Sequence, residues 1–187
     1  VLSFVFYLAV LFFLFQHRKT QEASHNYEIL MKSAGEGIHG LDLDGNITFI
    51  NPAGTSMIGW NREELLGKSH HSTLHHSYSD GSHYPREKSP IYATFSDGKS
   101  HHVDNEVFWR KDGTNFPVVY TCTPLLDGND IKGAMVVFKD ISERKQIEND
   151  LLNSKENARI IQSQLIEASE LNKKIFDTTN IGIIAYT

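Results

Sequence analysis

The chain has a single cysteine, Cys122, and no excess of positive charge. One cysteine excludes a disulfide framework within the chain and fits a reducing compartment. The formal net charge of -5 offers no basic surface for phosphates, so we expect no nucleic-acid partner. The sequence also lacks a nucleotide-binding motif, a phosphoacceptor histidine box and a paired nucleophile and base, so we assign no catalytic residue.

One long apolar run is present, from Val1 to Phe15, and its only polar atoms belong to Ser3 and Tyr7. Residues 1–17 are predicted to be the end of a transmembrane helix, and residues 18–25 a juxtamembrane linker. The basic residues after the run favour the cytoplasmic side for the rest of the chain. A secretory signal would place its charges before the run, and a buried helix would seldom be apolar on every face. We therefore expect residues 1–15 to contact membrane lipid.

Residues 26–141 are predicted to form an α+β domain. A short helix is expected near residues 26–33. Alternating apolar residues and Gly-containing turns then predict two strands, several short helices and three longer strands. The strands are expected at residues 38–43, 47–50, 102–110, 114–125 and 131–139. Asn51-Pro52 predicts the start of a helix that Gly59 ends, because Asn caps free amides and Pro needs no donor at the first helical position. Helices gathered between two groups of antiparallel strands indicate an α+β sheet with helices on one face.

Residues 142–174 contain no Gly or Pro and carry dense charge. Apolar residues recur there at spacings of three and four, with Leu151, Ala158 and Leu165 in phase and Asn172 next in the series. This pattern predicts a weak two-stranded coiled coil about four heptads long. A single amphipathic helix lying on its own domain is the alternative.

The region of residues 26–144 resembles a PAS domain. The resemblance rests on six short motifs in order: Ala34-x-x-Gly37-Ile38, Asp42-x-Asp44-Gly45-x-Ile47, Asn51-Pro52-Ala53, Gly59-Trp60 with Glu64-Leu65-Leu66-Gly67, Lys111-Asp112-Gly113, and Asp140-Ile141-Ser142-Glu143-Arg144. It implies the PAS fold, a five-stranded antiparallel sheet with short helices on one face around a small cavity. Residues 175–183 echo residues 30–38, so residues 175–187 are predicted to begin a second PAS domain.

The resemblance implies a cavity lined by Phe108, Val118, Tyr120 and Phe138, with a possible small-molecule ligand. In light-sensing PAS domains a cysteine attacks a flavin, and His70 occupies the corresponding position here. Polar amides that hold the flavin ring are replaced by Phe108, Val118 and Phe138, which would leave its buried polar edge unpaired. Haem sensors place a histidine on the helix before the third strand, and residues 90–96 contain none. The residues therefore disfavour both flavin and haem.

Histidine is concentrated between residues 70 and 102, which hold seven of the ten. His71 and His75 would share a helix face and are the candidate metal ligands. We prefer a structural or solvated role for these histidines, since no cysteine or clustered acidic residue accompanies them; proton sensing is a further alternative. Glu63, Glu64, Asp104 and Glu106 are interpreted as solvated residues.

The resemblance implies a signalling function. Asp140 would tie the last strand to the following helix, with Ser142, Arg144 and Asn172 on the relay path, in a parallel homodimer. We expect the domain to lie on the cytoplasmic side of an inner or plasma membrane and to serve an output domain in a longer protein. A sensor histidine kinase is the first expectation. The alternatives are a diguanylate cyclase, or a metal- or haem-binding redox-sensing module.

Overall fold

The computed structural model describes residues 12–13, 15–19, 21–22, 26 and 29–184, with side chains described up to Phe176. The chain divides into two compact units, Val1–Ile141 and Ser142–Thr187. The predicted transmembrane segment falls largely on residues outside the described ranges. Within those ranges, no helix combines the length and the hydrophobicity that crossing a bilayer requires.

The first unit contains a five-stranded antiparallel sheet in the order β2-β1-β5-β4-β3. Its strands are β1 (Gly37–Leu41), β2 (Ile47–Ile50), β3 (His101–Trp109), β4 (Asn115–Asp127) and β5 (Asp130–Asp140). The two strands nearest the N-terminus pair at one edge, and the last strand lies in the middle of the sheet. The predicted five-stranded antiparallel sheet is confirmed, and each predicted strand is present within a few residues.

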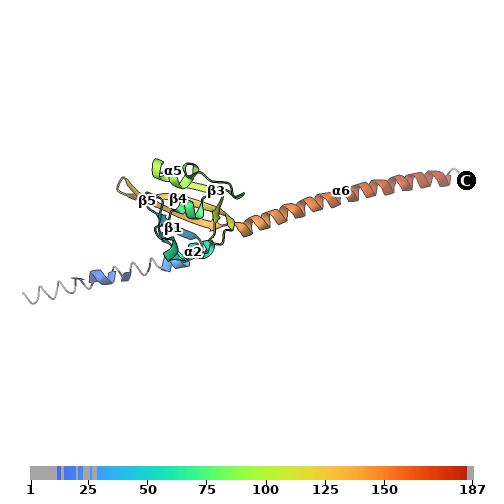
Figure 1. Ribbon diagram of the computed structural model, residues 1–187. Helices are drawn as coiled ribbons and strands as arrows, with labels where there is room; N and C mark the ends of the chain where they lie inside the picture. The colour runs from blue at the N-terminus through green and yellow to red at the C-terminus, as the bar shows by residue number, and fades with distance from the viewer. Residues whose placement is uncertain (1–11, 14, 20, 23–25, 27–28, 185–187) are drawn as a thin grey trace, which may run out of the picture. The chain divides into compact units, whose positions relative to one another are not determined.

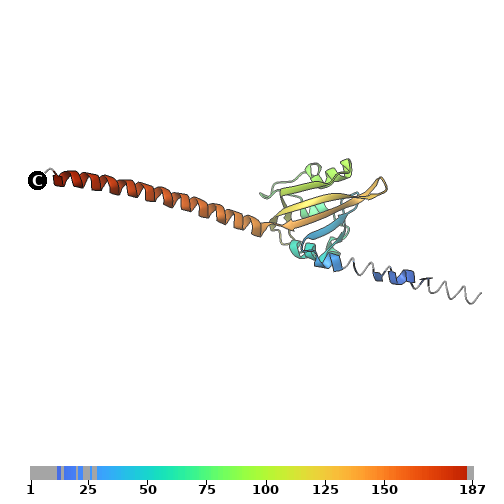
Figure 2. The ribbon, with the colours of Figure 1, turned by 180° about the vertical axis from the view of Figure 1, so that it is seen from behind.

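Short helices lie between β2 and β3 in sequence and on one face of the sheet (Figure 1). They are α2 (Pro52–Ile58), α3 (Arg62–Leu65), α4 (His70–Leu74), the 3₁₀ helix η1 (Arg86–Lys88) and α5 (Pro90–Asp97). Figure 2 shows the sheet from behind, with its strands toward the viewer. The other face of the sheet is thus free of these helices.

The start of α2 follows from the residue that precedes it. The Asn51 side chain accepts a hydrogen bond from the Gly54 amide (2.9 Å), which caps the helix as predicted. The same oxygen accepts from the Ile38 amide of β1 (2.8 Å), and the amide nitrogen donates to the Glu36 carbonyl (2.9 Å). Asn51 therefore fixes α2 to β1 as well as starting the helix.

The segment between α3 and α5 contains two short helices, α4 and η1. The sequence analysis placed a helix over residues 90–96, just before the third strand, and the structure adds these two ahead of it. Ser69 starts α4 by accepting from the Ser72 amide (3.4 Å). Leu74 is fully buried, so one apolar anchor suffices to pack α4 on the core and bring its histidines inside.

The core lies between the sheet and the helices. On β4, Phe116, Val118, Tyr120 and Cys122 are all buried, and they alternate with more exposed neighbours. Phe108 of β3 packs on Tyr120, with ring centroids 5.3 Å apart. This period of two gives one strand face to the core, as expected for a sheet covered on one side.

The second unit is dominated by α6 (Ser142–Ile184), which is ten residues longer than the predicted helix of residues 142–174. Its predicted seam is exposed within one chain, since Leu151 and Leu165 are 54% and 71% accessible. The coiled coil and the second PAS domain at residues 175–187 remain predictions.

Candidate functional site

Four histidines meet inside the domain. His39 comes from β1, His70 and His71 from α4, and His75 from the position directly after α4. His39, His70 and His75 are at most 1% exposed, and His71 is 9% exposed. A solvated role is therefore wrong for His70, His71 and His75, which α4 and its buried Leu74 hold inside the domain.

His39 and His70 are stacked in the core, with ring centroids 4.8 Å apart. None of their four ring nitrogens has a hydrogen-bond partner among the described residues. Burial lowers the pKa of His39 to about 3. Burial, followed by the nearby histidines, also lowers the pKa of His70 well below its ordinary value. Both imidazoles are consequently neutral at physiological pH.

Glu106 of β3 lies at the polar end of this cluster. Its carboxylate accepts hydrogen bonds from the hydroxyls of Tyr84 (2.7 Å) and Tyr120 (2.6 Å). His75 Nε2 lies 3.0 Å from the same carboxylate. Burial alone would raise the pKa of Glu106, but the hydrogen bonds from His75, Tyr120 and Tyr84 lower it overall. Glu106 is therefore a charged, half-buried carboxylate.

Sequence reasoning placed Glu106 on a solvated face, and the structure corrects this. Val103 pairs with Tyr120, and Glu106 pairs with Val118, so β3 has one residue more than β4 between these pairs. This β-bulge keeps Val103, Glu106 and Phe108 all on the side of the core. The signal was available, because Glu106 precedes the predicted cavity residue Phe108 by two positions and must share its face.

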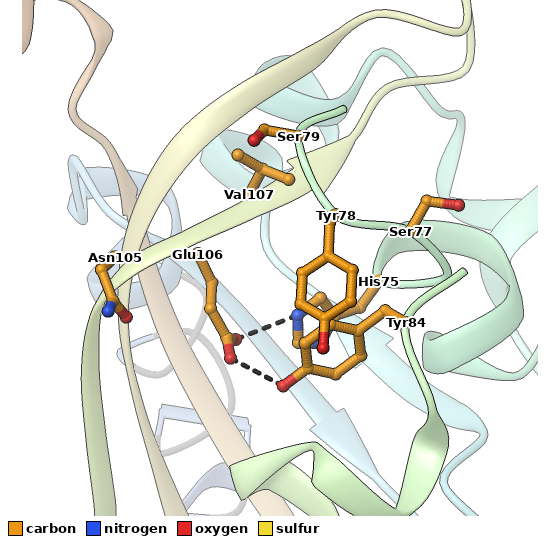
Figure 3. A pocket seen from close by; sticks show the side chains of 8 residues that line it. All are labelled: His75, Ser77, Tyr78, Ser79, Tyr84, Asn105, Glu106 and Val107. Carbon is orange, nitrogen blue, oxygen red and sulfur yellow. Dashed lines mark hydrogen bonds and ion pairs between the residues drawn. The ribbon is translucent and has the colours of Figure 1, made fainter. Parts of the chain in front are cut away.

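A pocket opens beside this carboxylate. It has a volume of about 200 Å³ and is lined by His75, Ser77, Tyr78, Ser79, Tyr84, Asn105, Glu106 and Val107. Figure 3 shows the Glu106 side chain directed toward His75 and Tyr84, with the ring of Tyr78 beside that of Tyr84. The loop after α4 and the middle of β3 thus form its two walls.

A family model described as the PAS fold matches residues 25–141 of this chain. The chain belongs to the PAS family. This match confirms the family that the six short motifs indicated, over almost the same residues.

The chain is 32% identical over 122 residues to the probable diguanylate cyclase DgcE of Escherichia coli (strain K12), covering 64% of this chain and 10% of that protein. It is 26% identical over 133 residues to the signal transduction histidine-protein kinase AtoS of the same organism, covering 71% of this chain and 21% of that protein. The PAS domain of the HTR-like protein from Haloarcula marismortui has a similar fold, with a TM-score of 0.55 and 20% identity. That match covers 67% of this chain and 98% of the archaeal chain. The chain therefore spans a small part of both curated relatives.

The four predicted cavity residues all lie in the PAS core. Phe108, Val118, Tyr120 and Phe138 are at most 1% exposed. The ring centroids of Phe108 and His70 are 5.2 Å apart, and those of Phe138 and His39 are 5.5 Å apart. The three aromatic residues thus lie beside the histidine cluster, with Tyr120 against His75, while the role of all four toward a ligand stays a prediction.

The candidate metal ligands His71 and His75 come close, with ring centroids 6.4 Å apart. His75 is already directed at Glu106, so the expectation of no acidic neighbour is wrong. No group of three metal-binding side chains was found within the described part of the chain.

Asp140 closes the sheet at the end of β5. Its carboxylate accepts from the Arg110 guanidinium at 2.6 Å, and the same guanidinium donates to the Met57 carbonyl (2.9 Å). The next residue, Ile141, is 3% exposed, and its amide donates to the Pro117 carbonyl (3.0 Å). The end of β5 is therefore held by Arg110, the residue that follows β3, and by Pro117 of β4, and Arg110 also joins it to α2. The other predicted relay residues, Ser142, Arg144 and Asn172, are all exposed on α6.

Proposed function

We propose that this chain is the sensory and dimerisation module of a membrane-anchored signalling receptor. A cue that binds in the PAS core, or alters the structure of the core, changes the packing around Glu106 and the histidines. The sheet passes this change to the end of β5, and α6 carries it to an output domain in the intact protein. The apolar run of residues 1–15 anchors the receptor, and the PAS domain lies on the cytoplasmic side.

One observation carries the relay. Glu106 pairs with Val118, and Val118 pairs with Asp140, so the half-buried carboxylate and the end of β5 lie in one row across three strands. A displacement of Glu106 along this row reaches the residue that holds β5 to Arg110. Helix α6 begins two residues later, at Ser142.

We infer a histidine kinase as the output, supported by the similarity to AtoS. A diguanylate cyclase is the second candidate, and the 32% identity to DgcE supports it. A redox module that binds metal or haem is the third. It draws support from the buried histidines alone, and an absorption spectrum with metal analysis of the purified chain separates it from the first two.

The test uses membranes that contain the intact protein. Phosphate transfer from ATP to histidine and formation of cyclic diguanylate from GTP are measured for the parent and two variants. Asp140→Asn removes the charge of the Arg110 pair, and we expect it to change basal output several-fold. The matched control, Asp130→Asn, removes a carboxylate from the exposed start of the same strand, where Asp130 pairs with Lys132. Absence of both activities, or equal effects of the two substitutions, would contradict the proposal.

A further inference from the structure

The pocket beside Glu106 has the lining of a small cation site. Its volume of about 200 Å³ lies below the range of drug-sized ligands, so the ligand must be small. The Glu106 carboxylate lines the pocket and remains accessible, with 17% of its side chain exposed. Tyr78, which is 38% exposed, stands at the rim beside Tyr84 (Figure 3).

The charge of the pocket selects the sign of the ligand. Among the described residues that line it, none is lysine or arginine. The Glu106 carboxylate is thus a half-buried negative charge with no lysine or arginine beside it in the lining, and the imidazole of His75 is its nearest nitrogen neighbour there. Such a site attracts cations and repels carboxylates and phosphates.

The hydrogen bonds of Glu106 indicate which kind of cation the pocket binds. A carboxylate offers about four acceptor positions, and Tyr84, Tyr120 and His75 direct three donors at this one. A primary ammonium, which carries three N–H donors, would find about one free acceptor position on the carboxylate and would need the oxygens of Ser77, Ser79 or Asn105 for the others. A quaternary ammonium needs none, because it binds through its diffuse charge and through contact with aromatic rings.

We infer that this pocket binds a small quaternary ammonium compound, and that this compound is the cue class of the receptor. The second half of this inference rests on the proposed function. The bulge in β3 turns Glu106 onto the core face, and the same residue heads the row that ends at Asp140. A cation that draws the Glu106 carboxylate toward the pocket therefore acts directly on the proposed relay.

The binding test is calorimetric titration of choline into the whole chain in nonionic detergent. We expect saturable binding that is roughly tenfold or more tighter than that of dimethylbutanol, the neutral isostere with carbon in place of the nitrogen. Glu106→Gln should weaken choline binding by roughly tenfold or more. The matched control Asp104→Asn makes the same charge change at an exposed position of β3 and should leave binding unchanged.

A second pair of variants keeps the test valid if Glu106→Gln fails to fold. Tyr78 is exposed at the rim, so its replacement leaves the core intact. Tyr78→Phe retains the ring and should retain binding, whereas Tyr78→Leu should weaken binding several-fold.

Three results would overturn the ligand assignment: no saturable choline binding, equal binding of choline and dimethylbutanol, or equal effects of Tyr78→Phe and Tyr78→Leu. Each of these leaves the proposed relay standing. Choline binding that leaves the output of the intact receptor unchanged would support the site and overturn its role as the sensor of the cue. The two failures are therefore distinguishable.

Discussion

Two neutral imidazoles are buried in the core of this PAS domain at the scale of single residues. The unfolded chain exposes His39 with an ordinary pKa near 6.5, while burial lowers the pKa of the folded residue to about 3. Between these values the unfolded state binds a proton that the folded state does not. Stability is therefore complete above pH 6.5 and falls as the pH decreases toward 3. His70 contributes to the pH dependence of stability in the same direction, since burial lowers its pKa too.

We predict that His39→Phe reduces the acid sensitivity of the fold. From the shift of His39 alone, the parent should lose about 2 kcal/mol of unfolding free energy between pH 7.5 and pH 5.0. The variant keeps an aromatic ring against His70 but has no group to protonate, so its loss should be smaller by about that amount. Urea unfolding at the two pH values gives both differences.

His83→Asn is the matched control, because it removes an exposed histidine from the same region. It should leave the pH dependence of the parent intact. If His39→Phe and His83→Asn show the same dependence as the parent, then His39 is protonated in the folded state and the core is more hydrated than the structure indicates.

Glu106 shows why the surroundings of a single residue could not be predicted from the sequence. Its type suggested a solvated position, and its spacing from Phe108 suggested the opposite. The spacing was right, because side-chain direction in a strand is fixed by geometry, while the cost of burying a carboxylate depends on partners distant in sequence. Tyr84 and Tyr120 lie 22 and 14 residues from Glu106 in sequence, and no local sequence pattern predicts that they donate hydrogen bonds to it.

Elements with strong local signals were predictable from the sequence. Asn51, Pro52 and Gly59 mark both ends of α2, and Gly98 ends α5 in the left-handed conformation that glycine tolerates. Helix α4 was missed because its five residues are too few to show a helical period. Its existence depends on the burial of Leu74 and the histidines, which only the folded core provides.

At the scale of elements, we predict how a substitution in α6 changes the self-association of this helix. Asn172 falls in phase with Leu151 and Leu165, so it lies in the seam if two helices pair in parallel. A buried Asn at such a position costs stability and fixes the register. Asn172→Leu should therefore tighten self-association of a peptide covering residues 142–175 by roughly tenfold or more, and broaden its range of oligomers. Analytical ultracentrifugation measures both effects.

Asn153→Leu is the matched control for this substitution. Asn153 lies two positions after Leu151, outside the predicted seam, and should change association little. Equal association of the parent and the Asn172→Leu peptide would show that α6 presents only an amphipathic face, so that the relay would require other contacts.

At the scale of the whole molecule, the sheet order bears on the proposed relay from the pocket to α6. The last strand, β5, lies between β1 and β4, so the end of the domain is joined to the sheet on both sides. His39 reaches the core from β1 and Glu106 reaches it from β3, and β5 lies between those strands with Phe138 against His39. A change in the buried polar cluster therefore acts on the strand that directly precedes α6.

The last prediction concerns where the molecule resides. The apolar run of residues 1–15 should hold the whole chain in the membrane fraction, whereas a chain of residues 19–174 should be soluble. Replacing Leu8 and Val10 by Arg places two charges in the run, each costing about 3 kcal/mol at the centre of a bilayer, and should release the chain from membranes. The matched control replaces Ile160 and Ile166 by Arg on the exposed surface of α6 and should leave the chain bound. Ultracentrifugation of cell lysates without detergent separates the fractions. Whole chain in the supernatant would contradict the anchor, and a receptor at the membrane would then need another attachment.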